Sequence, residues 1–449
     1  MTAFNPARPL RLGSIAVAVL TLAACGGGDI TEPDTAAANL AAADEPAARA
    51  GTLAASTLAA GSLPAGAIEL VTSVNGRAAT ASSQTCSVSA NGRLVLFASD
   101  GAAFVASDTN GRTDVFLKNL DTGDIQRVTT QSNGAQLAEG GSCRSMTPDG
   151  RFVSFGSGTA VFVKDTQTGQ LTQASPAAGT VPQVQGYFGG SMSADGRNIV
   201  FVTQPVTTQG VRFDLINVVP RRIMLRDLQT GSLQTLATDN GIVAQGQVIG
   251  LGAAISSDGT RVAFVSSFAG LVPGDNNNRE DVFVRDLDSG STTLVSSTSE
   301  GVASTAGQYE GVSLRSDNTV SFGTAGLSNL GPRGLYLKDL ATGSLTLVLG
   351  SPDGDATALS ADGRHVLFTR IYRNFDRRVF LRDRATGQDR LVSASASGTA
   401  SNGNSTGPRM SRDGSTVVFG SSARNLVSPR PQAGVFQVYA KSVAASGAN

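Results

Sequence analysis

The chain has 449 residues, 53 of them glycine, and 40% of its residues are hydrophobic, which suits a globular fold rich in tight turns. Its 35 basic and 35 acidic residues cancel, so it lacks the basic excess of a nucleic-acid-binding protein. A single histidine excludes a metal site built from several histidines, and no cofactor is expected.

The first 24 residues have the pattern of a bacterial secretory signal peptide. Arg8 and Arg11 precede an apolar run, Ile15 to Ala24, which is too short to span a bilayer. The run ends in Leu-Ala-Ala-Cys25, which resembles a lipobox, the motif whose cysteine becomes the lipidated first residue of a mature lipoprotein. The resemblance predicts that Cys25 carries a lipid anchor. An ordinary cleaved signal peptide with an incidental cysteine is the alternative.

Residues 25–67 form an Ala/Ser/Thr/Gly-rich tract, a composition typical of a flexible tether. Removal of residues 1–24 takes away two arginines and leaves 33 basic and 35 acidic residues, a net charge of −2. The lipobox also implies a destination. By the sorting pattern of such lipoproteins, Gly26 rather than aspartate after Cys25 predicts the outer membrane, with the folded part on the periplasmic face.

Between residues 89 and 419 a phrase of the form Ser-x-Asp-Gly-Arg-x-Val-x-Phe recurs seven times, which indicates a repeat architecture. An Asp-Gly pair between two runs of alternating polarity predicts a β-hairpin closed by a primed turn, because that turn needs positive φ. Each copy therefore predicts two adjacent antiparallel strands, a and b. The copies lie at 89–97, 147–155, Asp195-Gly196-Arg197, Asp258-Gly259, Asp317-Asn318, Asp362-Gly363-Arg364 and Asp413-Gly414.

A second phrase, of the form Val-Phe-Val-Arg-Asp-Leu, follows each of the first six copies and predicts a third strand, c. A Thr-Gly or Ser-Gly turn then leads into a short segment such as Thr293–Ser296, which predicts strand d. Four antiparallel strands per repeat are typical of the blades of a β-propeller. The copies of the second phrase begin at Val115, Val161, Ile223, Val282, Leu335 and Val379.

The seventh repeat has no strand d after its strand c. Its strands a, b and c are predicted at Met410–Arg412, Thr416–Phe419 and Val438–Val443, followed by a tail of residues 444–449. Ile68–Thr72 resembles the other strand-d segments, so we expect it to pair with the last strand c and close the ring. The sequence therefore predicts an all-β, seven-bladed propeller over residues 68–443 with a composite closing blade.

The paired phrases resemble those of the TolB-like, WD-repeat-like propeller family of bacterial envelope proteins, over about residues 68–443. The resemblance implies the propeller fold and a place in the cell envelope. It does not extend to TolB's additional α/β domain, which has no counterpart in residues 26–67. A direct role in the Tol system is therefore not expected.

Two residues suggest catalysis, and the surrounding sequence opposes both. His365 opens strand b of the sixth repeat, at a position that varies between repeats, so it is expected to be an ordinary strand residue. Ser405 is the centre of a Gly-x-Ser-x-Gly match, but this segment is expected to be a polar loop, whereas a nucleophile elbow joins a strand to a helix. The oligogalacturonate lyases, which resemble this chain in their propeller, use several histidines around a metal. No catalytic residue is predicted.

Two loops before strand c carry oxygen ligands at alternating positions, Asp108–Asp114 in the first repeat and Asp275–Asp281 in the fourth. The spacing resembles the start of a calcium loop, although the distal glutamate of an EF-hand is missing. Aspartate and asparagine are also ordinary turn residues, so no metal site is assigned. The aspartates of the Asp-Gly turns recur in nearly every repeat, which indicates that they shape turns and do not form a catalytic carboxylate pair.

Three segments depart from the repeat and are candidates for a functional surface: Tyr187–Gly190, Gln204–Arg222 and Ile371–Arg378. The last combines two aromatic and four charged residues, among them Arg373 and Arg377, which suits contact with a protein. A solvated loop is the alternative interpretation of that segment.

Cys86 and Cys143 are the cysteines of the expected propeller, and both are placed just before strand a in neighbouring blades. The periplasm is an oxidising compartment, so we predict a disulfide between them. The bond requires that their Cα atoms lie within about 7 Å of each other.

These observations favour a non-catalytic scaffold, a monomeric propeller anchored to the periplasmic face of the outer membrane that binds envelope proteins. The alternative is a propeller that binds or cleaves polysaccharide or peptidoglycan through acidic residues at its mouth. The sequence has no tryptophan and five tyrosines, which argues against the alternative because sugar sites usually stack on such rings.

Overall fold

The computed structural model describes residues 64–443 except 178, 183, 206–220, 239–251, 269, 274, 276, 278, 308, 316–317, 351–354 and 373–375. These residues belong to one compact unit of the chain. They form seven four-stranded antiparallel sheets and a two-stranded hairpin, and the described segments contain no helix. Accordingly, no described segment could cross a membrane as a helix. Cys25, the tether up to residue 63 and the tail lie outside the described residues.

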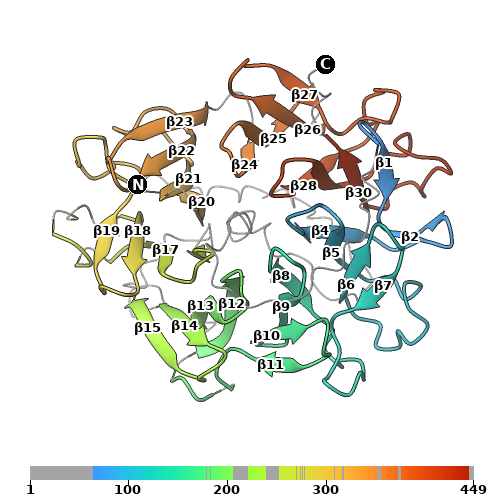
Figure 1. The fold of residues 1–449 in the computed structure, drawn as a ribbon, viewed down its shortest axis with the longest axis horizontal. Coiled ribbons are helices and arrows are strands. Elements are labelled where there is room, and N and C mark those ends of the chain that lie inside the picture. The colour runs from blue at the N-terminus through green and yellow to red at the C-terminus, as the bar shows by residue number, and fades with distance from the viewer. Residues whose placement is uncertain are drawn as a thin grey trace, which may run out of the picture. The chain divides into compact units, whose positions relative to one another are not determined.

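Figure 1 shows the seven sheets arranged as the blades of a ring, with strand a nearest the centre and strand d outermost. The chain is therefore a seven-bladed β-propeller, as predicted. Its strands, blade by blade, are β4 (Ser83–Val88), β5 (Leu94–Ser99), β6 (Asp114–Asn119), β7 (Ile125–Arg127); β8 (Ser142–Met146), β9 (Phe152–Ser157), β10 (Ala160–Asp165), β11 (Leu171–Gln173); β12 (Val184–Met192), β13 (Asn198–Pro205), β14 (Arg222–Asp227), β15 (Leu233–Thr238); β16 (Ala253–Ile255), β17 (Arg261–Ser266), β18 (Asp281–Asp286), β19 (Thr292–Leu294); β20 (Tyr309–Leu314), β21 (Thr319–Thr324), β22 (Gly334–Asp339), β23 (Leu345–Gly350); β24 (Asp355–Leu359), β25 (His365–Ile371), β26 (Arg377–Asp383), β27 (Asp389–Leu391); and β28 (Ser405–Met410), β29 (Thr416–Ser421), β30 (Gln437–Ser442) with β1 (Ile68–Leu70).

The seventh blade is composite, as the sequence predicted. Strand β1 pairs antiparallel with β30 in the register Ile68↔Lys441 and Leu70↔Tyr439. The two strands lie side by side although they come from opposite ends of the propeller sequence (Figure 1). The Thr72 hydroxyl extends the join by donating to Gln437 Oε1 at 2.6 Å. The sequence did not predict the hairpin of β2 (Ser73–Val74) and β3 (Arg77–Ala78) that follows.

The turn between strands a and b is a hairpin turn, but it is not of the primed type that we expected. In blade 1 the Gly92 N–H donates to Ser89 O at 2.9 Å, and the two residues between them do not have positive φ. Positive φ falls on the fourth residue, Gly92 (71°), a position that Asn318 (63°) fills in blade 5. The connection is therefore longer than the two-residue loop that calls for a primed turn.

Seven hydrophobic clusters form the core, one between each pair of neighbouring blades. Within most blades an aromatic ring of strand b stacks on one of strand c, as Phe97 does on Phe116, with ring centroids 5.5 Å apart. Blade 3 differs because Met224 occupies the strand-c position, and Tyr187 packs edge-on against Phe201 at 5.6 Å instead. The core thus rests on strands b and c, as expected for a chain without tryptophan.

Four buried lysines of strand c tie neighbouring blades together. Each ammonium group donates to at least one backbone carbonyl in strand d of the preceding blade or just after it; Lys164, for example, reaches Thr130 O at 3.0 Å. Burial lowers the pKa of each of the four lysines, because removal from water disfavours the charged form. The four are Lys118, Lys164, Lys338 and Lys441.

Candidate functional site

Antiparallel blades give the ring two different faces. The connections between strands a and b and between strands c and d lie at one end of each blade, and we call this end the turn face. The connections between strands b and c, and from strand d to the next strand a, lie at the other end, the loop face. The repeated phrases lie mainly on the turn face, whereas the segments that differ between blades lie mainly on the loop face.

On the turn face, the aspartates of the recurring Asp-Gly turns accept hydrogen bonds from residues of their own turns. Asp149 accepts hydrogen bonds from Thr147 Oγ1 (2.6 Å) and from the Arg151 N–H (3.0 Å). The arginine that follows then binds the aspartate of the second phrase, as in the Arg151–Asp165 pair at 2.9 Å. Equivalent Arg–Asp pairs join the two phrases in blades 3 and 6. In blade 4 the arginine lies one residue later in the chain, and Arg261 reaches Asp286 at 3.5 Å.

These ion pairs explain why the two phrases recur together. The hydrogen bond from Arg197 holds the pKa of Asp227 well below its usual range, and the one from Arg364 lowers the pKa of Asp383 to about 2. A carboxyl group that stays ionised cannot act as a general acid near neutral pH. The aspartates of the Asp-Gly turns accept hydrogen bonds from their own turns, which is the structural role that their recurrence indicated.

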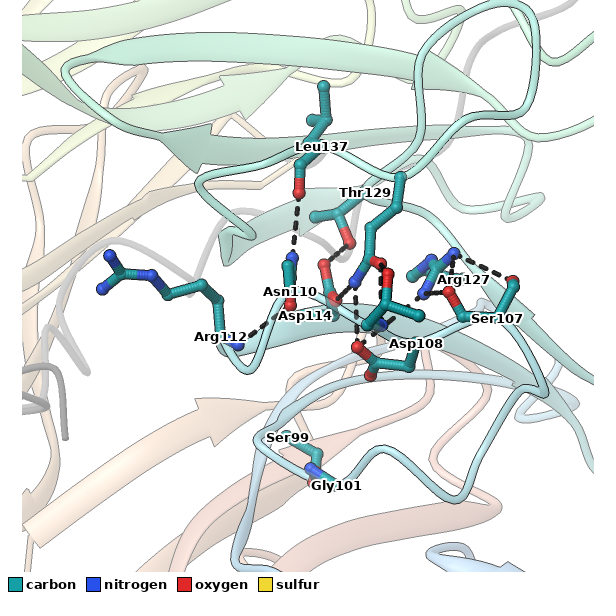
Figure 2. A network of polar contacts seen from close by, with 12 residues as sticks. Ser99, Gly101, Ser107, Asp108, Asn110, Arg112, Asp114, Arg127, Thr129 and Leu137 are labelled. Carbon is teal, nitrogen blue, oxygen red and sulfur yellow. Dashed lines mark hydrogen bonds and ion pairs between the residues drawn. The ribbon is translucent and has the colours of Figure 1, made fainter. Parts of the chain in front are cut away.

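On the loop face of blade 1, the seven residues Asp108–Asp114 form a loop, here called the blade-1 loop, whose polar groups bond to the protein itself (Figure 2). The Gln136 amide donates to both carboxylates of the loop, at 2.9 Å to Asp108 and 2.7 Å to Asp114. Arg127 lies 3.9 Å from Asp108, and the Thr129 hydroxyl donates to Asp114. Burial raises the pKa of Asp114 in spite of these bonds.

The corresponding loop of blade 4, Asp275–Asp281, is here called the blade-4 loop. Its last residue accepts hydrogen bonds from Ser296 Oγ (2.6 Å), Asn277 Nδ2 (2.7 Å) and the Tyr309 hydroxyl (3.3 Å), and burial raises the pKa of Asp281 to about 6. Asp275 is 4% exposed, and neither of its carboxylate oxygens makes a hydrogen bond of good geometry. The nearby backbone N–H of Asn277 offsets part of the effect of burial on the pKa of Asp275. Burial raises the pKa of Asp275 as well.

The described residues contain no group of three or more His, Cys, Asp or Glu side chains that could hold a metal ion. A calcium loop of the EF-hand type, with its several carboxylates, is therefore not present in the described part of either loop. In blade 1 the amide nitrogen of Gln136 lies between the two carboxylates, where a cation would otherwise be held.

The structure places both residues that suggested catalysis, His365 and Ser405, in β-strands. His365 is the first residue of β25, as expected, and is half-buried. Ser405 does not lie in a loop, as we expected, but in β28, where it is fully buried and its Oγ lies 3.0 Å from Ser421 Oγ. The expected loop was wrong because Ser405 pairs with Ser421 of β29, and strand a ends at Met410 where we expected it to begin.

Cys86 and Cys143 lie within the innermost strands β4 and β8, and not before them as expected. The structure joins them in a disulfide, with Cα atoms 6.1 Å apart, so the geometry permits the bond between neighbouring blades. Whether the thiols are oxidised in the cell stays a prediction.

The three segments that depart from the repeat differ in whether they are buried, exposed or outside the described residues. Tyr187 is buried in the core, so it does not contribute to a surface. Most of Gln204–Arg222 lies outside the described residues, as does Arg373. In the third segment Ile371 and Tyr372 are exposed, and the guanidinium of Arg378 lies 5.0 Å from the centre of the Tyr372 ring.

Sequence reasoning missed a second group of surface residues. Among the described residues, large exposed hydrophobic side chains occur only on blades 4, 5 and 6 and on the connections of these blades. Most lie at the loop face, and a strand pattern alone did not distinguish them from buried positions. They are Phe268, Val302, Leu327, Leu347, Ile371 and Tyr372.

Comparison with known proteins supports the fold. No protein-family profile and no curated relative matches the sequence. Among solved structures, the chain is similar to oligogalacturonate lyase from Vibrio parahaemolyticus, with 14% identity over 84% of this chain and 94% of that one and a TM-score of 0.57. A puromycin-hydrolyzing peptidase from Mycobacterium tuberculosis is 15% identical over 86% of this chain and 55% of that one, with a TM-score of 0.51.

TolB proteins are also among the structural neighbours. TolB from Acinetobacter baumannii is 14% identical over 74% of this chain and 76% of that one, with a TM-score of 0.37. At these identities the likeness concerns the propeller fold, which carries enzymes and binding proteins alike.

Proposed function

We propose that this protein is a non-catalytic, lipid-anchored propeller that binds a protein of the bacterial envelope through the loop face of blades 4 to 6. The observation that carries the proposal is the confinement of large exposed hydrophobic side chains to these three consecutive blades among the described residues. Apolar residues collected on one part of a surface are typical of protein-binding sites. A propeller presents such residues rigidly, because its loops rise from packed strands.

The place of the protein in the cell rests on its N-terminal sequence. Cys25 in its lipobox-like setting would carry the anchor, and residues 26–67 would let the propeller stand away from the outer membrane. A disulfide between Cys86 and Cys143 fits an oxidising compartment such as the periplasm.

The binding site is tested by crosslinking in intact cells followed by capture of the protein. Val302→Glu and Leu327→Glu place a charge on two exposed apolar positions and should reduce the amount of the crosslinked partner. Ala135→Glu is the matched control, because Ala135 holds the same position in the turn after blade 1 that Val302 holds after blade 4. Equal losses for the control and the test variants, or no loss for either, would contradict the proposed site.

The segment Ile371–Arg378, the third of the segments that depart from the repeat, offers a separate test of the same surface. Charge reversal at Arg377 and Arg378, together with Arg373, should weaken capture, because it changes the charge around the exposed Tyr372. The folded state of each variant is checked by its melting temperature before capture is compared.

An enzymatic function is tested on the purified protein with oligogalacturonate, other polysaccharides and peptidoglycan. We expect no release of products. A hydrolase or lyase activity that is abolished by His365→Ala or Ser405→Ala would replace the scaffold proposal with the enzymatic one.

The anchor is tested by metabolic labelling with an acyl analogue. The wild-type protein should be labelled and should fractionate with the outer membrane, whereas Cys25→Ala should be unlabelled. Equal labelling of the two proteins would show that Cys25 is not the lipidated residue.

A further inference from the structure

The blade-1 and blade-4 loops lie at equivalent places in two blades, and their described residues make the same backbone contacts. Both have seven residues and end on the first residue of strand c. In each loop the asparagine at the third position accepts a hydrogen bond from the N–H two residues later, at 2.8 Å in Asn110 and 2.7 Å in Asn277. The amide group of each asparagine also donates to a backbone carbonyl of the connection to the next blade. The described residues of the blade-4 loop therefore match the blade-1 loop in these hydrogen bonds, and the two loops differ in their surroundings.

In blade 1 the protein itself supplies the groups that neutralise the two carboxylates. Arg127 of strand d provides a positive charge 3.9 Å from Asp108, and Gln136 provides an amide that bridges Asp108 and Asp114. Both carboxylates are almost fully buried, with side-chain exposure of 3% for Asp108 and residue exposure of 0% for Asp114. Buried charges persist in proteins when they are paired in this way.

In blade 4 both of these partners are replaced by apolar residues. Strand pairing aligns Arg127 with Leu294, because each lies opposite the aromatic residue at the same place in strand c. The bridge at the start of the next connection aligns Gln136 with Ala303. Asp275 keeps its burial, at 4% exposure, but neither of its oxygens makes a hydrogen bond of good geometry. The backbone N–H of Asn277 only partly opposes the rise in the pKa of Asp275, and no charged group replaces Arg127.

The negative charge of Asp281, the last residue of the blade-4 loop, is only partly compensated by its neighbours. Asp281 is fully buried and accepts hydrogen bonds from the neutral groups of Ser296, Asn277 and Tyr309. Asn277 contacts both carboxylates, since its side-chain amide donates to Asp281 and its backbone N–H acts on Asp275, and the charge of Asp275 raises the pKa of Asp281. No ion pair joins either carboxylate to a lysine or arginine among the described residues. Two neighbouring buried carboxylates without a positive partner are strongly unfavourable unless something else neutralises them.

We propose that Asp275 and Asp281 bind a divalent cation, Ca²⁺, between blades 4 and 5, in the place that Gln136 and Arg127 occupy in blade 1. Ca²⁺ takes carboxylates together with amide, backbone carbonyl and water oxygens in a flexible geometry, so two carboxylates suffice as its charged ligands. Asp275 has both oxygens available for it. The cation joins the loop face of blade 4 to strand β20 of blade 5 through the bond between Tyr309 and Asp281.

The site is tested on the full-length protein with Tb³⁺, a luminescent substitute for Ca²⁺. The chain has no tryptophan, and the Tyr309 hydroxyl lies 3.3 Å from Asp281 Oδ1, so excitation of tyrosine should sensitise Tb³⁺ emission. We expect emission that saturates and is displaced by Ca²⁺. Asp275→Asn should weaken binding at least about tenfold, because it removes a charged ligand. Tyr309→Phe should lose the emission and keep the rise in melting temperature that Ca²⁺ produces.

Two control variants use the match between the loops. Asp108→Asn changes the blade-1 loop and should leave Tb³⁺ binding unchanged. Leu294→Arg combined with Ala303→Gln transfers the partners of blade 1 to blade 4, and should abolish binding and the Ca²⁺-dependent stabilisation while the protein stays folded. Emission that is unchanged in Asp275→Asn would overturn the proposal. A wild-type protein that is stabilised by acid and not by Ca²⁺ would also overturn it, because protons would then neutralise the site.

Discussion

The two faces of the ring are built from the same strands, but residues recur between blades on the turn face and differ between blades on the loop face. On the turn face, one arrangement recurs in most blades: an aspartate or asparagine holds the a–b turn in six of the described blades. In blades 1, 2, 3 and 6 an arginine joins this turn to the next phrase, as Arg364 does with Asp383 at 2.7 Å. On the loop face, equivalent positions hold different residues, such as Arg127 in blade 1 and Leu294 in blade 4. The difference teaches that the recurrent phrases in this sequence encode the scaffold, and that the departures from them carry whatever distinguishes one blade from another.

Neither face exists unless the ring is closed, so removal of β1 should have the largest effect. Deletion of residues 26–74 removes the pairing of β1 with β30 and the buried side chains of Leu70 and Val71. Each of these apolar side chains contributes about 1.5–3 kcal/mol when fully buried, and β30 loses its backbone partners. The melting temperature should fall sharply, whereas deletion of residues 26–60 should leave it unchanged. Equal melting temperatures for the two deletions would contradict the composite blade.

The disulfide lies on the innermost strands and belongs to neither face, so its loss should affect stability without affecting partner capture. Cys86 and Cys143 are separated by 57 residues, and a disulfide that closes a loop of this kind contributes about 2–4 kcal/mol. The double variant Cys86→Ser/Cys143→Ser should unfold at lower denaturant concentration than the wild type. The wild type under reducing conditions should match the variant. Two free thiols in non-reduced periplasmic protein would refute the bond.

Lys441 connects the loop face to the closing blade, and its contribution should depend on pH. Burial, together with the smaller effect of the nearby positive charge of Arg390, lowers the pKa of Lys441 from 10.5 to about 8. Between these values the unfolded chain binds more protons than the folded one, so the free energy of unfolding should rise as the pH increases from about 8 to about 10. Between about pH 8 and about pH 10 the free energy of unfolding of the wild type should rise by about 1–3 kcal/mol relative to that of Lys441→Met, since one pKa unit corresponds to about 1.4 kcal/mol.

That gain is measured by denaturant unfolding of both proteins at several pH values. The other titrating groups are common to the two proteins and cancel in the difference. A difference that stays constant over this range would mean that Lys441 keeps its ordinary pKa in the folded protein.

A single substitution on the turn face should have the smallest effect. The Arg364 side chain is 54% exposed, and exposed ion pairs contribute little because water and salt screen them. Arg364→Ala should therefore change the melting temperature only slightly and leave partner capture intact. If Arg364→Ala reduced capture as much as Val302→Glu, the assignment of binding to the loop face would be wrong.

Much of the fold could be predicted because it depends on local chemistry that repeats. Each Asp-Gly turn and each Val-Phe-Val-Arg-Asp phrase places its own strands, and the similarity of Ile68–Thr72 to other strand-d segments identified the closing strand. The predictions failed where pairing overrode composition. Ser405 lies in a polar stretch that reads as a loop, yet its pairing with Ser421 makes it part of a buried strand.

The sequence by itself determined the number of blades and the residues that shape the turns, because these follow from short segments whose partners lie nearby in the chain. It also determined the composite closure, because Ile68–Thr72 resembles the strand-d segments of the other repeats, although its partner β30 lies at the other end of the propeller sequence. Only the tertiary structure decided which buried carboxylates have a positive charge or a hydrogen-bond donor beside them. Asp108 and Asp275 occupy similar sequences, but their environments are set by residues of strand d and of the next connection, 19 to 28 positions away. Burial and charge compensation depend on such neighbours, which come together only when the strands pack into blades and the blades into a ring.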